Sequence, residues 1–244
     1  MNRIVSLVLI LGTAMVARAQ VDPVAAYRQR QQEATPASVL SWLQEGNRRF
    51  LAGASQHGGY PEDARERIKV AAQGQRPLAV VLSCIDSRTT PELVFDTSVG
   101  DLFTARVGAN VVNDDVLGSL EIAASSGARV LVVLGHTDCG GVKAAVNGTE
   151  LGHFTQLLAR VKPAIKATGD RLDADPVASA QVGERVVTNR RYIAEVSHTN
   201  AAASTRAIRE ASPVLRELLD KGELLIVTAE FDVDTGRVIF DSAR

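Results

Sequence analysis

Two short, nearly continuous apolar runs constrain the fold of this chain more than any other feature of its sequence. They span residues 78–84 and 130–134 and consist mainly of valine, leucine and alanine. Runs of this length, without the polar alternation of a half-exposed strand, are typical of strands buried on both faces of a parallel sheet. Helices must then cover both faces, so the two runs predict an α/β fold.

Strand-like and helical patterns alternate over the rest of the chain. Further strands are expected over 102–107, 224–231 and 238–240, and helices over 38–51, 114–126, 140–147, 154–168 and 178–220. Residues 20–35 are expected to form a polar lead-in, and residues 53–75 a loop with a short helix. The predicted fold is therefore a mostly parallel β-sheet of four strands plus an antiparallel edge strand, flanked by helices. Neither an internal repeat nor a linker is evident, which favours a single domain over residues 20–244.

Charge and composition exclude several classes of function. The chain has 27 basic and 28 acidic residues without a long run of like charge, which argues against binding of nucleic acid. Aromatic residues make up only 4%, so a base-stacking surface is not expected. Two cysteines cannot form a framework of several disulfides. What remains is a globular domain that acts on something small.

The first nineteen residues have the pattern of a secretory signal peptide. A positively charged start is followed by an apolar run over 4–16 and by the small-x-small sequence Ala17-Arg18-Ala19. The run is too short to span a bilayer, and no cysteine follows the cleavage site to carry a lipid anchor. A buried N-terminal helix is the alternative, but Arg18 would fit it poorly. We therefore expect a cleaved signal over 1–19 and a periplasmic or secreted protein without a membrane anchor.

Potential metal ligands follow two of the predicted strands. Cys84 ends the first apolar run, and His136 and Cys139 follow the run at 130–134. Neighbouring parallel strands would bring these three side chains to one edge of the sheet. Two thiolates and an imidazole suit zinc, and three protein ligands leave one coordination position open. Asp86 and Arg88 come just after Cys84, so a carboxylate held by an arginine is expected beside the metal.

The residues alone leave other interpretations open. An exported protein with two cysteines can form one disulfide, here between Cys84 and Cys139. Cys84 could instead be a nucleophile with His136 as its base, or Asp86 could complete a structural zinc site as the fourth ligand. The pair formed by Asp86 and Arg88 could also be an ordinary surface ion pair.

Taken together, these segments resemble the β-class carbonic anhydrases over roughly residues 37–240. The family pattern is matched by Cys84-Ile85-Asp86-Ser87-Arg88 and by His136-Thr137-Asp138-Cys139-Gly140-Gly141. Segments 43–50, 106–110 and 232–236 resemble the N-terminal helix, the second-strand loop and the final turn of the family.

The resemblance implies reversible hydration of carbon dioxide to bicarbonate and a proton by zinc-bound hydroxide. It implies one zinc ion per chain on Cys84, His136 and Cys139, with Asp86 and Arg88 as the catalytic dyad. Residues that it implies to line the substrate pocket are Gln75, Phe103 and Gly140. The family further implies a homodimer or homotetramer with carbon dioxide and bicarbonate as its small-molecule substrates.

Two positions depart from the family pattern. Ile122 replaces a tyrosine of the pocket, which puts the shape of the pocket in doubt. Val81 replaces a tryptophan that helps to form a regulatory bicarbonate site in one branch, so that site looks absent although Arg106 is present. We therefore expect the permanently open form of the site, in which water rather than Asp86 is the fourth ligand of zinc. Hydrolysis of carbon disulfide or carbonyl sulfide on the same scaffold, and a non-catalytic zinc or bicarbonate sensor, are the alternative functions.

Overall fold

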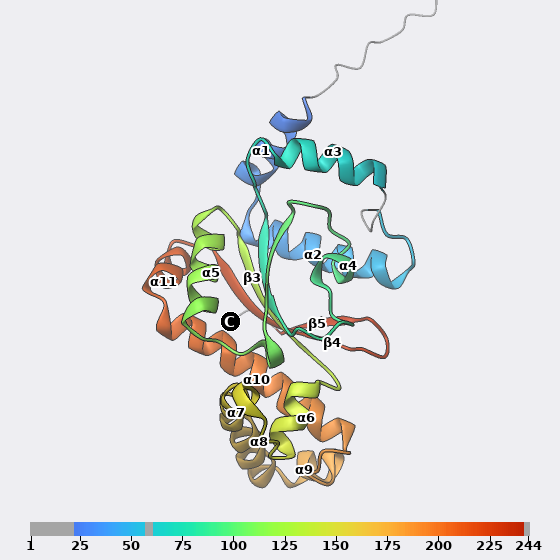
Figure 1. Ribbon diagram of the computed structural model, residues 1–244, viewed down its shortest axis with the longest axis vertical. Helices are drawn as coiled ribbons and strands as arrows, with labels where there is room; N and C mark the ends of the chain where they lie inside the picture. The colour runs from blue at the N-terminus through green and yellow to red at the C-terminus, as the bar shows by residue number, and fades with distance from the viewer. Residues whose placement is uncertain (1–21, 57–60, 242–244) are drawn as a thin grey trace, which may run out of the picture.

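The centre of the protein is one five-stranded sheet in the order β2-β1-β3-β4-β5 (Figure 1). A computed structural model describes residues 22–56 and 61–241. The strands are β1 (Ala79–Ser83), β2 (Leu102–Arg106), β3 (Val130–His136), β4 (Leu225–Phe231) and β5 (Val238–Phe240). The first four are parallel and β5 pairs antiparallel with β4, which confirms the predicted fold class.

The two apolar runs form the most deeply buried strands of the sheet. Every residue of β1 and of β3 is buried, because these strands lie side by side at the centre of the sheet and helices cover both of their faces. One face packs against α2 (Pro36–Leu51) and α4 (Pro91–Val94). The other packs against α5 (Asp114–Ser125), α10 (Arg190–Ala211) and α11 (Pro213–Asp220).

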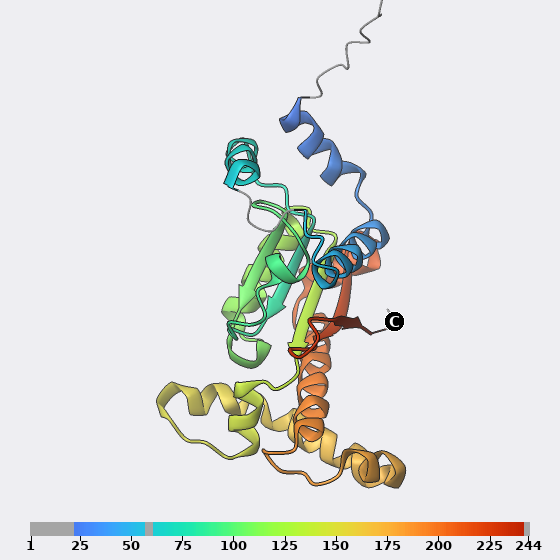
Figure 2. The ribbon, with the colours of Figure 1, turned by 90° about the vertical axis from the view of Figure 1, so that its right-hand side faces the viewer.

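Four shorter helices lie beyond the carboxyl ends of the strands, beside the first half of α10 (Figures 1 and 2). They are α6 (Gly140–Val146), α7 (Gly152–Ala159), α8 (Lys162–Ala174) and α9 (Pro176–Val182). Their apolar side chains form a separate core cluster that includes Cys84, Cys139 and Ala109, the last of which lies in the 3-10 turn η1 (Gly108–Asn110). This packing places two of the predicted metal ligands inside a core rather than on the surface.

The polar lead-in expected at 20–35 contains a helix that the sequence pattern did not predict. Helix α1 (Pro23–Glu33) forms there, and in Figure 2 it extends away from the sheet. Asp22 caps the helix and Pro23 begins it, both strong signals for a helix start. Its contacts are polar: Tyr27 donates a hydrogen bond to the carbonyl of Gly100 at 2.6 Å, and Gln31 donates one to the carbonyl of Pro77 at 2.9 Å. A helix held in this way has no apolar stripe to reveal it.

Two of the predicted helices are divided in the structure. The stretch 178–220 contains the end of α9, then α10 and α11, with breaks at Gly183, whose φ is 81°, and at Ser212, which caps α11 in front of Pro213. The stretch 154–168 is divided between α7 and α8 just before Pro163. The short helix expected within 53–75 is α3 (Pro61–Ala71).

Within residues 22–56 and 61–241, no helix combines the length and the apolar character needed to cross a bilayer. The signal peptide predicted over 1–19 lies outside the described residues and stays a prediction.

Candidate metal centre

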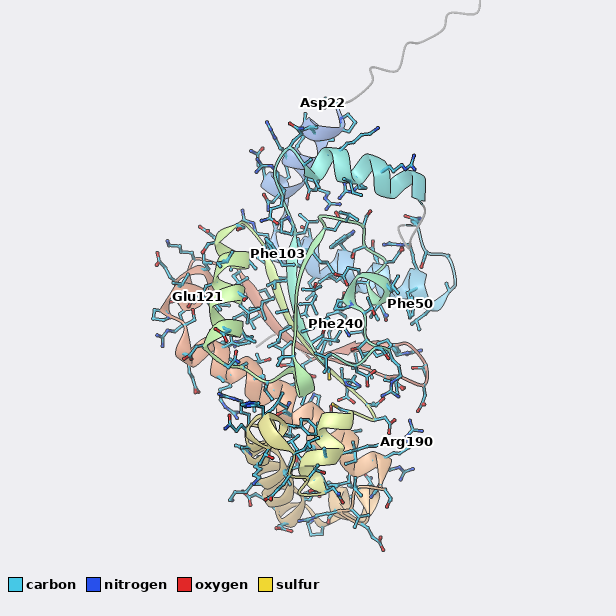
Figure 3. The ribbon with its side chains drawn as sticks, viewed as in Figure 1. Asp22, Phe50, Phe103, Glu121, Arg190 and Phe240 are labelled. Carbon is cyan, nitrogen blue, oxygen red and sulfur yellow. The ribbon has the colours of Figure 1, made fainter. Side chains whose placement is uncertain are left out.

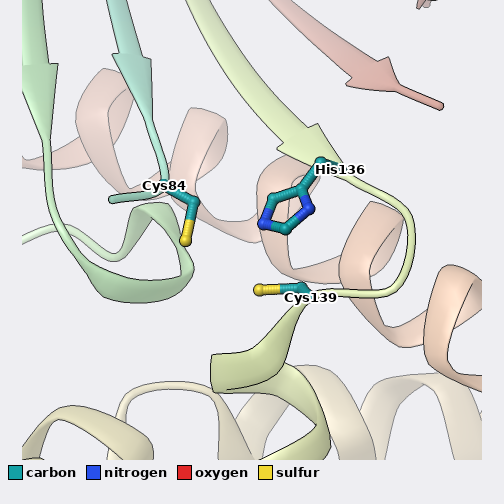
Figure 4. Close-up of side chains that lie close together, drawn as sticks. All are labelled: Cys84, His136 and Cys139. Atoms are coloured by element: carbon teal, nitrogen blue, oxygen red, sulfur yellow. The ribbon is translucent and has the colours of Figure 1, made fainter. Parts of the chain in front are cut away.

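Three buried side chains converge where the strand order reverses. Cys84 directly follows β1, His136 is the last residue of β3, and Cys139 caps the start of α6. Because β1 and β3 are neighbours and β2 lies on the far side of β1, this edge is a topological switch point of the sheet. The ligand atoms of the three residues lie within 4.8 Å of one another, and Figure 4 shows the side chains pointing together.

The 3-10 turn η1 and the start of α6 approach each other closely, and η1 holds Cys84 in place. The backbone N–H of Ala109 donates a hydrogen bond to Cys84 Sγ at 3.3 Å, and Ala109 has the left-handed φ of 52°. A Cβ added to Gly141 would come within 3.0 Å of Ala109 Cβ. Glycine at position 141 therefore lets α6 pack directly on η1, which brings Cys139 toward Cys84.

The imidazole of His136 is oriented with one nitrogen toward the two sulfurs. Its Nδ1 lies 2.9 Å from the carbonyl oxygen of Thr137, and because a carbonyl can only accept, Nδ1 must carry the proton. Nε2 then has a free lone pair, is fully buried, and has no hydrogen-bond partner within the described part of the chain. A buried acceptor without a partner is costly, so this nitrogen fits a metal ligand.

The two cysteines are free thiols, so the structure contains no disulfide between them. A hydrogen bond from Cys139 lowers the pKa of Cys84, and the same hydrogen bond together with burial raises the pKa of Cys139. The two sulfurs therefore lie close enough to interact directly, and two thiolates with one imidazole form a donor set that suits zinc.

A carboxylate held by an arginine faces this cluster. Arg88 Nε and Nη2 donate to the two oxygens of Asp86 at 2.9 and 2.8 Å, and the backbone N–H of Arg88 adds a bond of 2.9 Å. The bidentate contact lowers the pKa of Asp86 to about 2, so this carboxyl is ionised at neutral pH. Asp86 Oδ2 lies 4.0 Å from His136 Nε2. The side chain is thus close to the cluster but bound to the arginine.

Two further side chains support the loop after β1. Arg106 donates to the carbonyls of Cys84 at 3.0 Å and Asp86 at 2.6 Å, and Thr89 Oγ1 donates to the carbonyl of Asp86 at 3.1 Å. From the sequence, Arg106 was expected in the second-strand loop and beside a regulatory site, and no role was expected for Thr89. The register of the sheet, which pairs Arg106 with Ser83, is what brings the guanidinium to this loop.

The three residues expected to line a substrate pocket do not lie together in one chain. Gly140 follows Cys139 at the start of α6. Phe103 pairs with Val80 in the amino-terminal half of the sheet, as Figure 3 shows, and the exposed Gln75 precedes β1. Gln75 and Cys84 therefore lie beyond opposite ends of β1.

Fold and site together define an α/β protein with a potential metal centre at the switch point of its sheet. The carbonic anhydrase family profile matches residues 79–238. Carbonic anhydrase 2 of Mycobacterium tuberculosis is 34% identical over 209 residues, covering 82% of this chain and 91% of the relative. The carbonic anhydrase of Mycolicibacterium smegmatis is 32% identical, with the same coverage. The chain belongs to the β-class carbonic anhydrases, enzymes of carbon dioxide hydration.

Solved structures share this fold. A tetrameric β-carbonic anhydrase from Sordaria macrospora has a TM-score of 0.63 at 23% identity, covering 73% of this chain and 87% of that one. A Coccomyxa β-carbonic anhydrase in complex with acetazolamide has a TM-score of 0.60 at 22% identity, covering 82% and 85%. Both support the sheet topology described above.

Proposed function

We propose that this protein catalyses the reversible hydration of carbon dioxide to bicarbonate and a proton, with one zinc ion per chain. Cys84, His136 and Cys139 would hold the zinc. The observation that carries the proposal is the position of Asp86, which is bound by Arg88 and still lies 4.0 Å from the free Nε2 of His136. A protein that only binds zinc does not need a carboxylate held beside the ligands.

The ligand residues have defined tasks. Zinc supplies Lewis acidity, which makes water nucleophilic near neutral pH. His136 offers Nε2, because the bond from Nδ1 to the Thr137 carbonyl selects this tautomer. Both cysteines bind as thiolates and offset the charge of the cation. Three protein ligands leave one coordination position for the chemistry.

Asp86 and Arg88 orient the reacting water. With zinc bound, Asp86 Oδ2 would accept a hydrogen bond from the attacking water and so orient it toward the substrate. Arg88 occupies both carboxylate oxygens and keeps them ionised, with the pKa of Asp86 at about 2. The arginine also prevents the carboxylate from becoming a fourth ligand, which would block the reaction.

A second copy of the chain would complete the substrate pocket. Gln75 and Phe103 lie near the amino end of the sheet, too far along β1 to reach the cluster of their own chain. Two copies packed in opposite directions along the strands would bring these residues to each other's metal centre. Ile85 and Leu93, exposed by 65% and 51%, provide apolar surface for such contact. The tetrameric relative from Sordaria macrospora is consistent with this assembly, so we propose a homodimer or homotetramer.

Arg88→Ala tests the proposed function directly. The variant should retain about one zinc per chain and lose roughly 100-fold in hydration rate, because the freed carboxylate can take the open position. Arg88→Lys should recover only part of the rate, since an ammonium cannot make the two-pronged contact. The measurement is stopped-flow hydration per bound zinc. Arg185→Ala, which removes an ion pair with Asp173 on the helical end, is the matched control. A near wild-type rate in fully zinc-loaded Arg88→Ala would contradict the proposal.

We also propose that the protein is exported. Protein isolated from its native host should begin at Gln20, because the pattern at 17–19 fits signal cleavage. N-terminal sequencing of the cellular fractions measures this. Recovery of the chain with Met1 from the cytoplasm would contradict it.

A further inference from the structure

Arg88 is held at both edges of its guanidinium group. One edge binds Asp86, as described above. At the other edge, Nη1 lies 3.4 Å from Asp138 Oδ2, and Nη2 donates to the backbone carbonyl of Asp138 at 3.3 Å. Arg88 therefore bridges the loop that follows β1 and the loop that follows β3. These are the two loops that carry the cysteines.

Asp138 is in turn held by groups outside the dyad. It lies between His136 and Cys139 in the chain and has a left-handed φ of 57°. Its Oδ1 forms an ion pair with Lys143 of α6 and lies 3.9 Å from Arg190 Nε. Figure 3 shows Arg190 beside the helices at the carboxyl end of the sheet. Asp138 thus has cationic partners on both of its carboxylate oxygens, Lys143 and Arg190 at Oδ1 and Arg88 at Oδ2.

This arrangement matters because the contact between Arg88 and Asp86 is open to solvent. The Arg88 side chain is 45% exposed, and an exposed arginine–carboxylate pair contributes only about 0–1 kcal/mol by itself. An arginine bound on a single edge would exchange readily with water and release the carboxylate. A second attachment on the opposite edge restricts rotation of the guanidinium group and so keeps it on the carboxylate.

We propose that Asp138 is a positioning residue of the hydration reaction. By binding the outer edge of Arg88, it keeps the guanidinium in the plane that holds Asp86 beside the ligand cluster and out of the open coordination position. Lys143 binds the other oxygen of Asp138, so that Asp138 anchors Arg88 without drawing it away from Asp86. This inference rests on the proposed roles of Asp86 and Arg88.

Asp138→Asn is the sharpest test, because asparagine accepts the left-handed backbone as well as aspartate does. We expect full zinc content, an unchanged KM and a kcat about tenfold lower, in the range for residues that support metal-site groups. In an Arg88→Ala background the same substitution should change kcat by less than about twofold, since no guanidinium is left to position.

A second readout does not depend on turnover. In the cobalt(II)-substituted protein the visible absorption bands report the donor set of the metal. Asp138→Asn should shift these bands in the same direction as Arg88→Ala. Asp234→Asn is the matched control, because Asp234 binds Arg190 at 2.6 Å in the same group of charges and is not among the residues that bind Arg88. It should keep the wild-type spectrum and kcat.

Three results would overturn the inference: a wild-type kcat in zinc-loaded Asp138→Asn, an equal tenfold fall in the Arg88→Ala background, or an unchanged cobalt spectrum. If Arg88→Ala hydrates carbon dioxide slowly while Asp138→Asn keeps the wild-type kcat, only the role of Asp138 is rejected. If zinc-loaded Arg88→Ala keeps a near wild-type rate, the proposed function itself is rejected.

Lys143→Gln is the second test variant if Asp138→Asn does not fold. It should lower kcat, because without Lys143 the Asp138 carboxylate is free to move and draws Arg88 away from Asp86, and an unchanged kcat would count against the inference.

Discussion

The two ends of the sheet each contain an aspartate bound by arginine, in very different surroundings. At the carboxyl end, Asp86 is bound by Arg88, is partly exposed, and faces the three side chains that could hold a metal ion. At the amino end, Asp101 is 1% exposed and is bound by both Arg30 and Arg67. The pairing is chemically the same. One carboxylate faces a potential metal centre, and the other joins separate segments of the chain.

The ion pairs at the two ends of the sheet have different tasks. Arg30 belongs to α1 and Arg67 to α3, so Asp101 joins two helices that come before β1 to the loop that leads into β2. Tyr27 strengthens the same junction, since Arg67 and Arg30 lie over its ring at 4.8 and 5.8 Å from the ring centre. The amino end is therefore a junction of distant segments of the chain, whereas the carboxyl end holds the proposed metal centre. Substitutions should affect stability at the first and activity at the second.

The largest effect is expected from Cys84→Ala at the carboxyl end. Loss of one of three protein ligands should remove zinc and reduce hydration by roughly 1000-fold or more, because the reaction depends on the metal. The free energy of unfolding of the zinc-free protein should change much less, since only one small side chain is lost from the core. Elemental analysis, the hydration assay and urea unfolding measure these outcomes. Full zinc content in Cys84→Ala would mean that the cluster is not the metal centre.

Asp101→Asn should have the opposite pattern at the amino end. The arginines would lose their buried partner, and breaking such a pair costs about 3 kcal/mol of unfolding free energy. The hydration rate per folded, zinc-loaded chain should stay within about twofold of wild type, because Asp101 is far from the cluster of its own chain and is not one of the amino-end residues proposed to line the partner's pocket. Urea unfolding and active-site-normalised kinetics test this. A large loss of activity without a loss of stability would mean that the ends are coupled, and the comparison would fail.

The smallest effect is expected from Glu230 of β4, a carboxyl at the carboxyl end that takes no part in the cluster. Burial raises its pKa from 4.5 to about 7, with Glu195 adding to the rise and His198 opposing it. The folded state then binds a proton that the unfolded state has already lost, so stability falls as the pH rises from about 4.5 to about 7. The total loss is at most about 3 kcal/mol.

Glu230→Gln should therefore match wild type near pH 4 and be more stable at pH 8, as measured by urea unfolding at both values. Glu150→Gln, at an exposed position, is the control and should keep the wild-type stability curve. Parallel stability curves for wild type and Glu230→Gln would contradict this prediction.

Prediction from sequence worked where the signal is local. The apolar runs at 78–84 and 130–134 identified the central strands, and their order along the chain was enough to expect Cys84, His136 and Cys139 at one edge. It failed for α1, whose polar residues are held by Pro77, Gly100 and Asp101, far away in the chain. It also failed to divide 178–220, because the capping role of Ser212 is not visible in helical periodicity.

What the amino-acid sequence determined by itself is the chemistry at the ends of the strands: which donors follow β1 and β3, and which carboxylate stands two residues from its arginine. These features depend on neighbours in the chain and on burial of short apolar runs. Only the tertiary structure decided that His136 Nε2 has no hydrogen-bond partner among the described residues, that Asp138 holds the outer edge of Arg88, and that Gln75 and Phe103 lie at the far end of the sheet. Each of these depends on strand register and on the packing of α6 against η1, which bring together atoms that sequence spacing does not relate.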